Sequence, residues 1–212
     1  NFPNYTIKDD KLNILAFSYL EVGCSFAENQ DLEKARLPLE KASSILEYVH
    51  GSVSNRINSS NYFGLISALA YYVAFQYSKS FILINKLESN TLIGKLTSLF
   101  LKRNFTELIE EIIKISIDDT YKDENIVALN NDIDDTKIYE VIFAKTFNRF
   151  IQYFYTGDEN FLTEAKTDLL LLKEISEIKK DPGIWWVIRL LLLILENFKK
   201  ASLWNVLKDY FD

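Results

Sequence analysis

Residues that make tight turns are scarce in this chain, which has six Gly and three Pro among its 212 residues. A β-sandwich or barrel joins many short strands by such turns, whereas long helices need few of them. Apolar residues also recur at spacings of three and four along much of the sequence, as one face of a helix requires. These two features together predict an all-α fold.

The first two periodic segments, 12–26 and 32–49, predict an antiparallel helical hairpin. The letters "ENQD" separate them, and Gly51 is placed to end the second helix. Small residues let paired helices approach closely, and the hairpin carries the small-aromatic-small-large-small spacing of the tetratricopeptide motif. The residues with this spacing are Gly23, Phe26, Ala35, Leu39 and Ala42. The hairpin is therefore predicted to be partly tetratricopeptide-like.

Further hairpins are predicted at 61–87, at 91–117 with Asn104 as a cap, and at 136–178 with "TGDEN" as the turn. In the last hairpin, apolar residues at helical spacing are typical of a packed core rather than a cofactor site. They are Phe143, Phe147, Phe150 and Phe154 in one helix and Leu162, Ala165, Leu169 and Leu172 in the other. Because no strict period recurs, the fold is predicted to be an irregular bundle of antiparallel hairpins.

The expected domain organisation is a single helical domain over residues 1–212. Within it, the apolar pattern lapses at 118–135, where acidic residues predominate. This stretch is typical of a solvated loop, and we interpret it as the join between two sub-halves, 1–117 and 136–212.

One apolar run, from Ile184 to Leu195, is too short to be a membrane span. A membrane helix needs about 20 mostly apolar residues, and this run is interrupted by Arg189 and closed by Glu196. Asp181 can cap a helix of a soluble protein, with Pro182 at its first position. Apolar residues cover nearly all sides of this helix, so neighbouring helices are expected to pack around it.

Arg189 is the unusual residue of this helix and has two interpretations. It either pairs with a carboxylate or caps a neighbouring helix, because charges are rarely buried alone. Alternatively it faces a partner domain together with a tryptophan, since Trp and Arg are enriched at interfaces. The candidate interface residues are Trp185, Trp186, Arg189 and Trp204.

The sequence offers little chemistry for catalysis. His50 and Cys24 are the only residues of their types, which excludes Cys/His zinc sites and disfavours a His-based triad. No Gly-rich phosphate loop is present, so we predict no catalytic, cofactor or metal site in this chain. An enzyme with an unrecognised carboxylate site remains an open alternative.

Charge and cysteine content bound the partners and the compartment. The net charge of −6 and the sequence pI near 5.0 repel a phosphate backbone overall, so nucleic acid would need a local basic patch. The basic pairs Lys102-Arg103, Lys179-Lys180 and Lys199-Lys200 follow predicted helices, where they complement the helix dipole. A lone cysteine and the absence of a visible signal peptide favour a cytoplasmic setting.

Several segments resemble the helical N-terminal region of large bacterial superfamily 2 DEAD/DEAH-box helicases, among them anti-phage helicases of the Hachiman type. The segments are "KARLPLEKASSILEYVHG" (34–51), "ALAYYVAFQYSKSFILINKL" (68–87), "LFLKRNFTELIEEI" (99–112), "YFYTGDENFLTEAKTDLLLLKEI" (153–175) and "DPGIWWVIRLLLLILENFKKASLWNVL" (181–207). The paired tryptophans followed by "SLWNVL" are the most distinctive element, and in such proteins they lie shortly before the helicase core.

The resemblance implies an ATP-driven motor on nucleic acid, with a Walker A loop, a Walker B box and arginine fingers in two RecA-like domains. None of these motifs occurs in this chain, so no catalytic residue carries over. The expected function is a non-catalytic N-terminal accessory domain, with ATP and Mg bound elsewhere in the full-length protein. Its expected partners are the helicase core of the same polypeptide, DNA or RNA, or an effector protein, and not a membrane. A free-standing tetratricopeptide-like adaptor for protein–protein interaction is the alternative.

Overall fold

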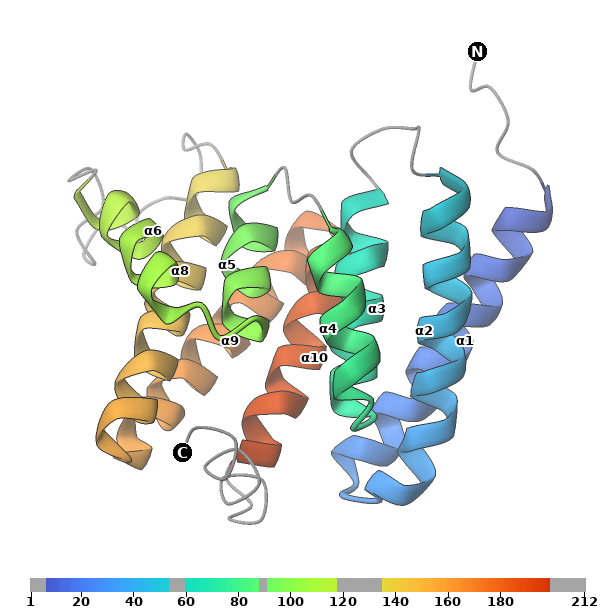
Figure 1. Ribbon diagram of the computed structural model, residues 1–212, viewed down its shortest axis with the longest axis horizontal. Helices are drawn as coiled ribbons and strands as arrows, with labels where there is room; N and C mark the ends of the chain where they lie inside the picture. The colour runs from blue at the N-terminus through green and yellow to red at the C-terminus, as the bar shows by residue number, and fades with distance from the viewer. Residues whose placement is uncertain (1–6, 54–59, 88–90, 118–134, 199–212) are drawn as a thin grey trace. The chain divides into compact units, whose positions relative to one another are not determined.

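The computed structural model describes residues 7–53, 60–87, 91–117 and 135–198 (Figure 1). All the regular secondary structure in these ranges is α-helix. In these ranges the chain forms α1 (Ile7–Glu28), α2 (Leu32–Val53), α3 (Ser60–Val73), α4 (Tyr77–Lys86), α5 (Leu92–Leu101), α6 (Phe105–Ile117), α8 (Asp135–Thr156), α9 (Glu159–Lys179) and α10 (Pro182–Phe198). The predicted all-α fold is confirmed, and so is its construction from antiparallel pairs. The predicted acidic loop lies outside the described residues except for Asp135, the first residue of α8.

The chain divides into two compact units. One contains Asn1–Glu88 with Trp186–Asp212, and the other contains Ser89–Trp185. The first unit therefore holds α1 to α4 and most of α10, and the second holds α5, α6, α8, α9 and the first turn of α10. A single functional domain over 1–212, with sub-halves 1–117 and 136–212, stays a prediction.

In the first unit, α1 and α2 form the predicted hairpin at very close approach. Gly23 is buried against α2, and a Cβ atom added there would lie 2.6 Å from Leu39 Cγ and 3.1 Å from Leu39 N. No larger residue fits without moving the helices apart. α2 continues to Val53, so the predicted stop at Gly51 is wrong: a glycine weakens a helix by about 1 kcal/mol but does not by itself end it.

Hydrogen bonds from serine side chains join the next helices of the first unit. Ser67 Oγ of α3 donates to the carbonyl oxygen of Ser43 in α2 at 2.8 Å, and Ser80 Oγ of α4 donates to that of Ala68 in α3 at 2.8 Å. All four residues are buried. Small hydroxyl side chains thus satisfy their own polarity while the helices stay close together.

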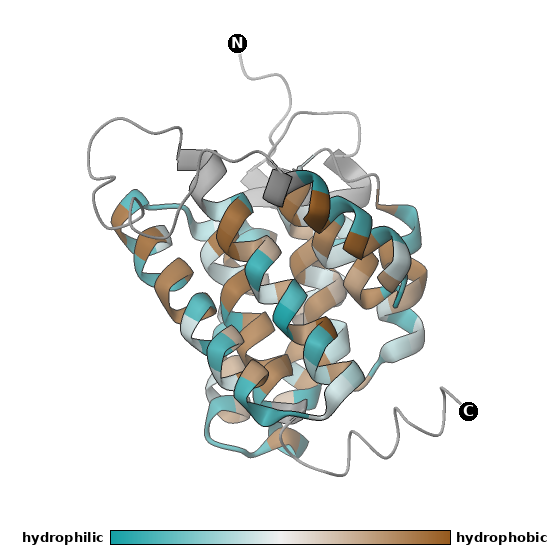
Figure 2. Ribbon diagram, turned by 90° about the vertical axis from the view of Figure 1, so that its left-hand side faces the viewer, coloured by the Kyte–Doolittle hydropathy of each residue, from teal (hydrophilic) through white to brown (hydrophobic). Residues whose placement is uncertain are grey.

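The second unit is built around phenylalanine side chains of α5 and α8. The Phe100 ring lies 5.1 Å from the Phe150 ring and 5.2 Å from the Phe147 ring, measured between centroids. Phe143, Phe147 and Phe150 are completely buried, as predicted for core residues. Figure 2 shows hydrophobic and hydrophilic residues alternating along the helices, as expected where each helix buries one side.

Four of the helix ends share one turn geometry that does not use glycine. Gln30, Phe75, Arg103 and Lys180 each follow a helix with φ between 56° and 66°. In each turn this residue donates its N–H to the carbonyl three residues back, and the next residue donates to the one five back. These are Schellman motifs, which normally place Gly at the left-handed position. Because these four turns place other residues at the left-handed position, the chain ends its helices with few glycines.

Candidate functional site

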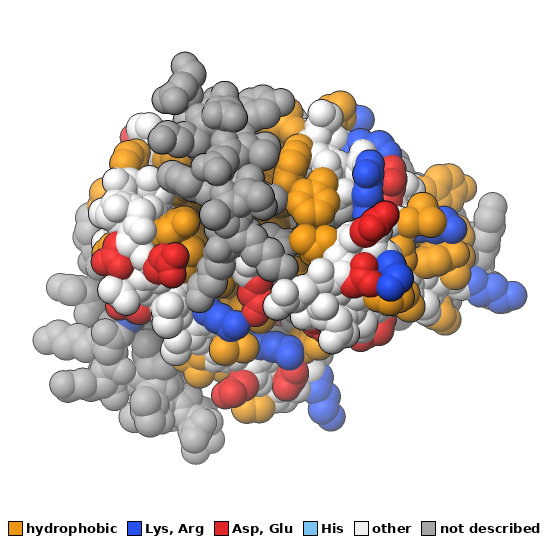
Figure 3. Space-filling view, turned by 90° about the horizontal axis from the view of Figure 1, so that it is seen from below, with side chains coloured by type: hydrophobic (Ala, Val, Ile, Leu, Met, Phe, Trp, Pro, Cys, Tyr) orange, Lys and Arg blue, Asp and Glu red, His pale blue; other side chains and the backbone are white. Residues whose placement is uncertain are grey.

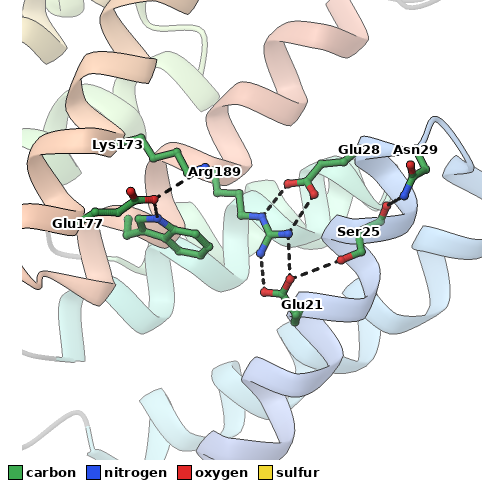
Figure 4. Close-up of polar contacts among 8 residues, drawn as sticks. Glu21, Ser25, Glu28, Asn29, Lys173, Glu177 and Arg189 are labelled. Carbon is green, nitrogen blue, oxygen red and sulfur yellow. Dashed lines mark hydrogen bonds and ion pairs between the residues drawn. The ribbon is translucent and has the colours of Figure 1, made fainter.

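Arg189 of α10 is held by two carboxylates of α1, more than 160 positions away in the sequence (Figure 4). Its Nε and Nη2 atoms donate to Glu28 Oε1 at 2.7 Å and Oε2 at 3.0 Å. Its Nη1 and Nη2 atoms donate to Glu21 Oε2 at 2.5 Å and Oε1 at 3.1 Å. Both pairs are bidentate, the strongest geometry for an arginine and a carboxylate. The predicted pairing of Arg189 with a carboxylate is confirmed.

The two carboxylates share a face of α1 because they are seven residues apart. Ser25 lies between them and donates from Oγ to Glu21 Oε1 at 3.4 Å. Arg189 was predicted from the sequence to need a partner, but Glu21 and Glu28 were not predicted to be its partners. The signal was present, because Glu21 and Glu28 are carboxylates at helical spacing on a segment expected to pack in the core.

Burial and charge have opposite effects on this cluster. The Arg189 side chain is only 9% exposed, while Glu21 and Glu28 are about half exposed. Burial alone would lower the pKa of Arg189, but hydrogen bonds to Glu28 and Glu21 outweigh it and raise that pKa further. The hydrogen bond from Arg189 in turn lowers the pKa of Glu21, against a smaller opposing effect of burial. Arg189 and Glu21 are therefore both charged near neutral pH.

Trp186 lies beside this cluster in the first unit. Arg189 Cζ is 5.2 Å from the centroid of the Trp186 ring, and the Phe17 ring of α1 is 5.7 Å from it. Trp186 is 9% exposed. It thus contributes a cation–π contact and apolar packing that fix α10 against α1. Cys24 of α1 is fully buried, and burial raises the pKa of its thiol to about 12.

Trp185 belongs to the second unit and has different contacts. Its Nε1 atom donates to Glu177 Oε1 at 2.9 Å, and Lys173 Nζ lies 5.6 Å from the centroid of its ring. Both partners are on α9. Asp181 caps the start of α10 as predicted, because its Oδ1 accepts from Gly183 N and Ile184 N, both at 3.1 Å.

Two of the sequence-based candidates lie outside the described residues: Trp204 and the basic pair Lys199-Lys200. The remaining basic pairs flank the ends of α5 and α9, where Lys102 and Lys180 are the C-terminal cap residues. The interface role of the tryptophans and Arg189 stays a prediction.

The described residues do not meet the requirements of a metal site or of a membrane-spanning helix. Within the ranges that the structure describes, no group of three His, Cys, Asp or Glu residues could hold a metal ion. Of the helices in these ranges, none combines the length and apolar character that a membrane span requires. The side chain of His50 lies outside the described part of the chain.

The described residues define an all-α protein of antiparallel helical pairs in which a buried arginine joins α10 to α1. No protein-family model matches the chain. Among curated proteins, Hachiman protein HamB from Bacillus cereus is 38% identical over 213 residues, which cover all of this chain and 18% of HamB. The chain is therefore homologous over its full length to a part of HamB, and the predicted Hachiman-type resemblance is confirmed. It spans less than a fifth of the length of this relative.

Proposed function

We propose that this chain is a non-catalytic accessory domain of an ATP-dependent, DEAD/DEAH-box nucleic-acid helicase that acts in anti-phage defence. The observation that carries the proposal is the 38% identity to HamB over the whole chain, which takes in only 18% of HamB. A homologous segment of this size leaves ample room for two RecA-like domains elsewhere in such a protein. ATP and Mg would act in those domains.

The proposed role is to dock on the motor, and through it to guide nucleic acid or a partner protein. Arg189 contributes indirectly, because its guanidinium is fully engaged by Glu21 and Glu28 and so holds α10 on α1. Trp185 and Trp186 are placed by the same helix. Trp185 and Trp204 are the residues we assign to the contact with the motor, while the buried Trp186 fixes α10 on α1.

Deletion of this region from the longer helicase tests the proposal. The helicase lacking residues 1–212 should keep measurable ATP hydrolysis, while its unwinding of a duplex should fall, because the motor is intact but its accessory domain is missing. The separate 212-residue chain should hydrolyse no ATP above the background of a Walker A lysine variant. ATP hydrolysis by the separate chain would contradict the proposal.

A tetratricopeptide-like adaptor is the second candidate, and the α1–α2 hairpin favours it. Gly23 packs directly on Leu39, and Ala35 and Ala42 are buried, as the small and large positions of that motif require. An adaptor of this kind would bind a peptide with no motor attached. The separate chain should then pull down the same protein partner from cells that contain the helicase and from cells that lack it. Binding that occurs only through the motor would contradict this candidate.

A further inference from the structure

The first hairpin exposes an apolar surface, which we call the α1–α2 face. It consists of Leu15, Tyr19 and Val22 of α1 and Leu37, Lys41 and Tyr48 of α2. Within each helix these residues recur at spacings of three, four or seven, so each set lies on one side of its helix. The two sets meet, because Lys41 Nζ lies 5.4 Å from the centroid of the Tyr19 ring.

This face is unusually apolar for an exposed helical surface. Leu15 and Val22 are 45% and 46% exposed, and Leu37 and Tyr48 are each 58% exposed. Figure 3 shows hydrophobic side chains gathered on the side where Figure 1 places α1 and α2. A face like this one is typical of a surface that another element covers.

The charges around the face are distributed asymmetrically. Four carboxylates of the hairpin are engaged elsewhere: Glu21 and Glu28 bind Arg189, Glu40 pairs with Lys79, and Glu47 accepts from Tyr71 Oη at 3.3 Å. Glu33 and Lys11 are exposed one turn beyond Leu37 and Leu15, at the ends of the face. Lys41 lies between Leu37 and Tyr48 along α2, and its ammonium group is over the Tyr19 ring of α1. The face is therefore complementary to an apolar surface that carries a central negative charge.

We infer that the α1–α2 face binds an acidic amphipathic helix of a partner protein. Leu15 and Val22 are seven residues apart, which is about 10 Å along a helix. A partner helix that places a carboxylate on Lys41 and apolar residues one turn to either side would cover both ends of the face, as in other helix-binding surfaces. This inference does not depend on the helicase assignment, because the surface lies within the hairpin itself.

Selection from a peptide library tests the inference with the whole 212-residue chain. A phage-displayed library of 16-residue helices with randomised surface positions would be panned on the chain, with the Val22→Asp chain in solution as competitor. Selected peptides would then be synthesised, and their affinity would be measured by fluorescence anisotropy. The enriched peptides should carry Asp or Glu between apolar residues at helical spacing.

Matched variants give the test its specificity. Val22→Asp should weaken binding at least tenfold, whereas Ile178→Asp, at an apolar residue of α9 that is 76% exposed, should leave it unchanged. Lys41→Glu should weaken binding at least fivefold, and exchange of the peptide carboxylate for lysine should restore it. Circular dichroism checks the fold of each variant, and Leu37→Asp replaces Val22→Asp if that chain fails to fold.

Three results would overturn the inference. One is a selection that enriches no peptide, and another is a set of binders without carboxylates or with equal affinity for the Val22→Asp and Ile178→Asp chains. The third is a dimer, seen by sedimentation equilibrium and dissociated by Val22→Asp, because it would assign the face to a second copy of this chain.

Discussion

Replacement of Arg189 by methionine should destabilise the first unit, because this side chain ties α10 to α1. Methionine keeps most of the apolar stem but removes the four hydrogen bonds to Glu21 and Glu28. Breaking a fully buried ion pair costs about 3–5 kcal/mol. Here both carboxylates are half exposed and regain water, so the solvent-screened loss should be smaller, at about 2–3 kcal/mol.

Urea unfolding followed by far-ultraviolet circular dichroism measures this loss, and hydrogen exchange shows where it occurs. Amides of α1 and α10 should lose protection first. Lys34→Met is the matched control, because Lys34 pairs with Asp31 on the exposed side of the same hairpin. That substitution should leave the free energy of unfolding nearly unchanged.

Removal of all three charges should recover most of the loss. In the variant with Arg189→Met, Glu21→Gln and Glu28→Gln, no carboxylate is left facing an apolar side chain. Its free energy of unfolding should lie within about 1 kcal/mol of the natural chain, as for other ion clusters replaced by neutral residues. A change below about 0.5 kcal/mol for Arg189→Met alone, with no coupling to Glu28→Gln, would refute the reasoning.

The pH dependence of the same pair of proteins has a definite sign. Arg189 lowers the folded-state pKa of Glu21 below its ordinary value of 4.5. A depressed carboxyl pKa contributes stability that is present above the unfolded-state value and is lost as the pH falls through the folded-state value. The stability difference between the natural chain and Arg189→Met should therefore be constant near pH 7 and shrink below pH 4.5. A difference that grows on acidification would contradict this assignment.

Three further predictions concern packing and turns. Gly23→Leu should reduce the free energy of unfolding by about 1–3 kcal/mol or more through overpacking against Leu39, and so lower the thermal midpoint, whereas Asp134→Asn should leave the midpoint unchanged. Equal midpoints for the two variants would show that the hairpin assignment is wrong. Lys180→Gly should raise the free energy of unfolding, measured with urea, by about 0.5–1 kcal/mol, because glycine adopts the left-handed conformation of this residue without strain. A lower free energy of unfolding would show that the Lys180 backbone is not strained. Phe150→Ala should lower the free energy of unfolding by about 3–5 kcal/mol, and Tyr155→Ala, at an exposed residue, should hardly change it. Similar losses for the two variants in chemical denaturation would contradict the assignment of Phe150 to the core.

Local pattern predicted most of this fold, and the reason is visible in particular residues. Periodicity gave the helical pairs, and Asn104 and Asp181 begin their helices because polar side chains at these positions accept from free backbone amides. The end of α2 was placed two residues too early, at Gly51, because a glycine weakens a helix without ending it. The left-handed geometry at Gln30, Phe75 and Arg103 was not predicted, since no glycine marks it, although "ENQD" and Asn104 did indicate the turns around Gln30 and Arg103.

The candidate site was predicted only in part, because its geometry depends on contacts between distant segments. Arg189 was identified as a charge that needs a partner, but Glu21 and Glu28 lie more than 160 residues earlier in the sequence. Nothing in the spacing of either segment specifies that α10 packs on α1. The separate contacts of the adjacent residues Trp185 and Trp186, one with α9 and the other with α1, likewise follow from three-dimensional packing.

The sequence of the native gene around this chain tests the central claim most directly. If the chain is an accessory domain of a HamB-like helicase, the same open reading frame should encode a Walker A motif, G-x-x-x-x-G-K-[ST], followed by an acidic Walker B box. A reading frame that encodes these 212 residues without any phosphate-binding loop would contradict the claim. The chain would then be a helical adaptor, with the α1–α2 face as its first surface to test.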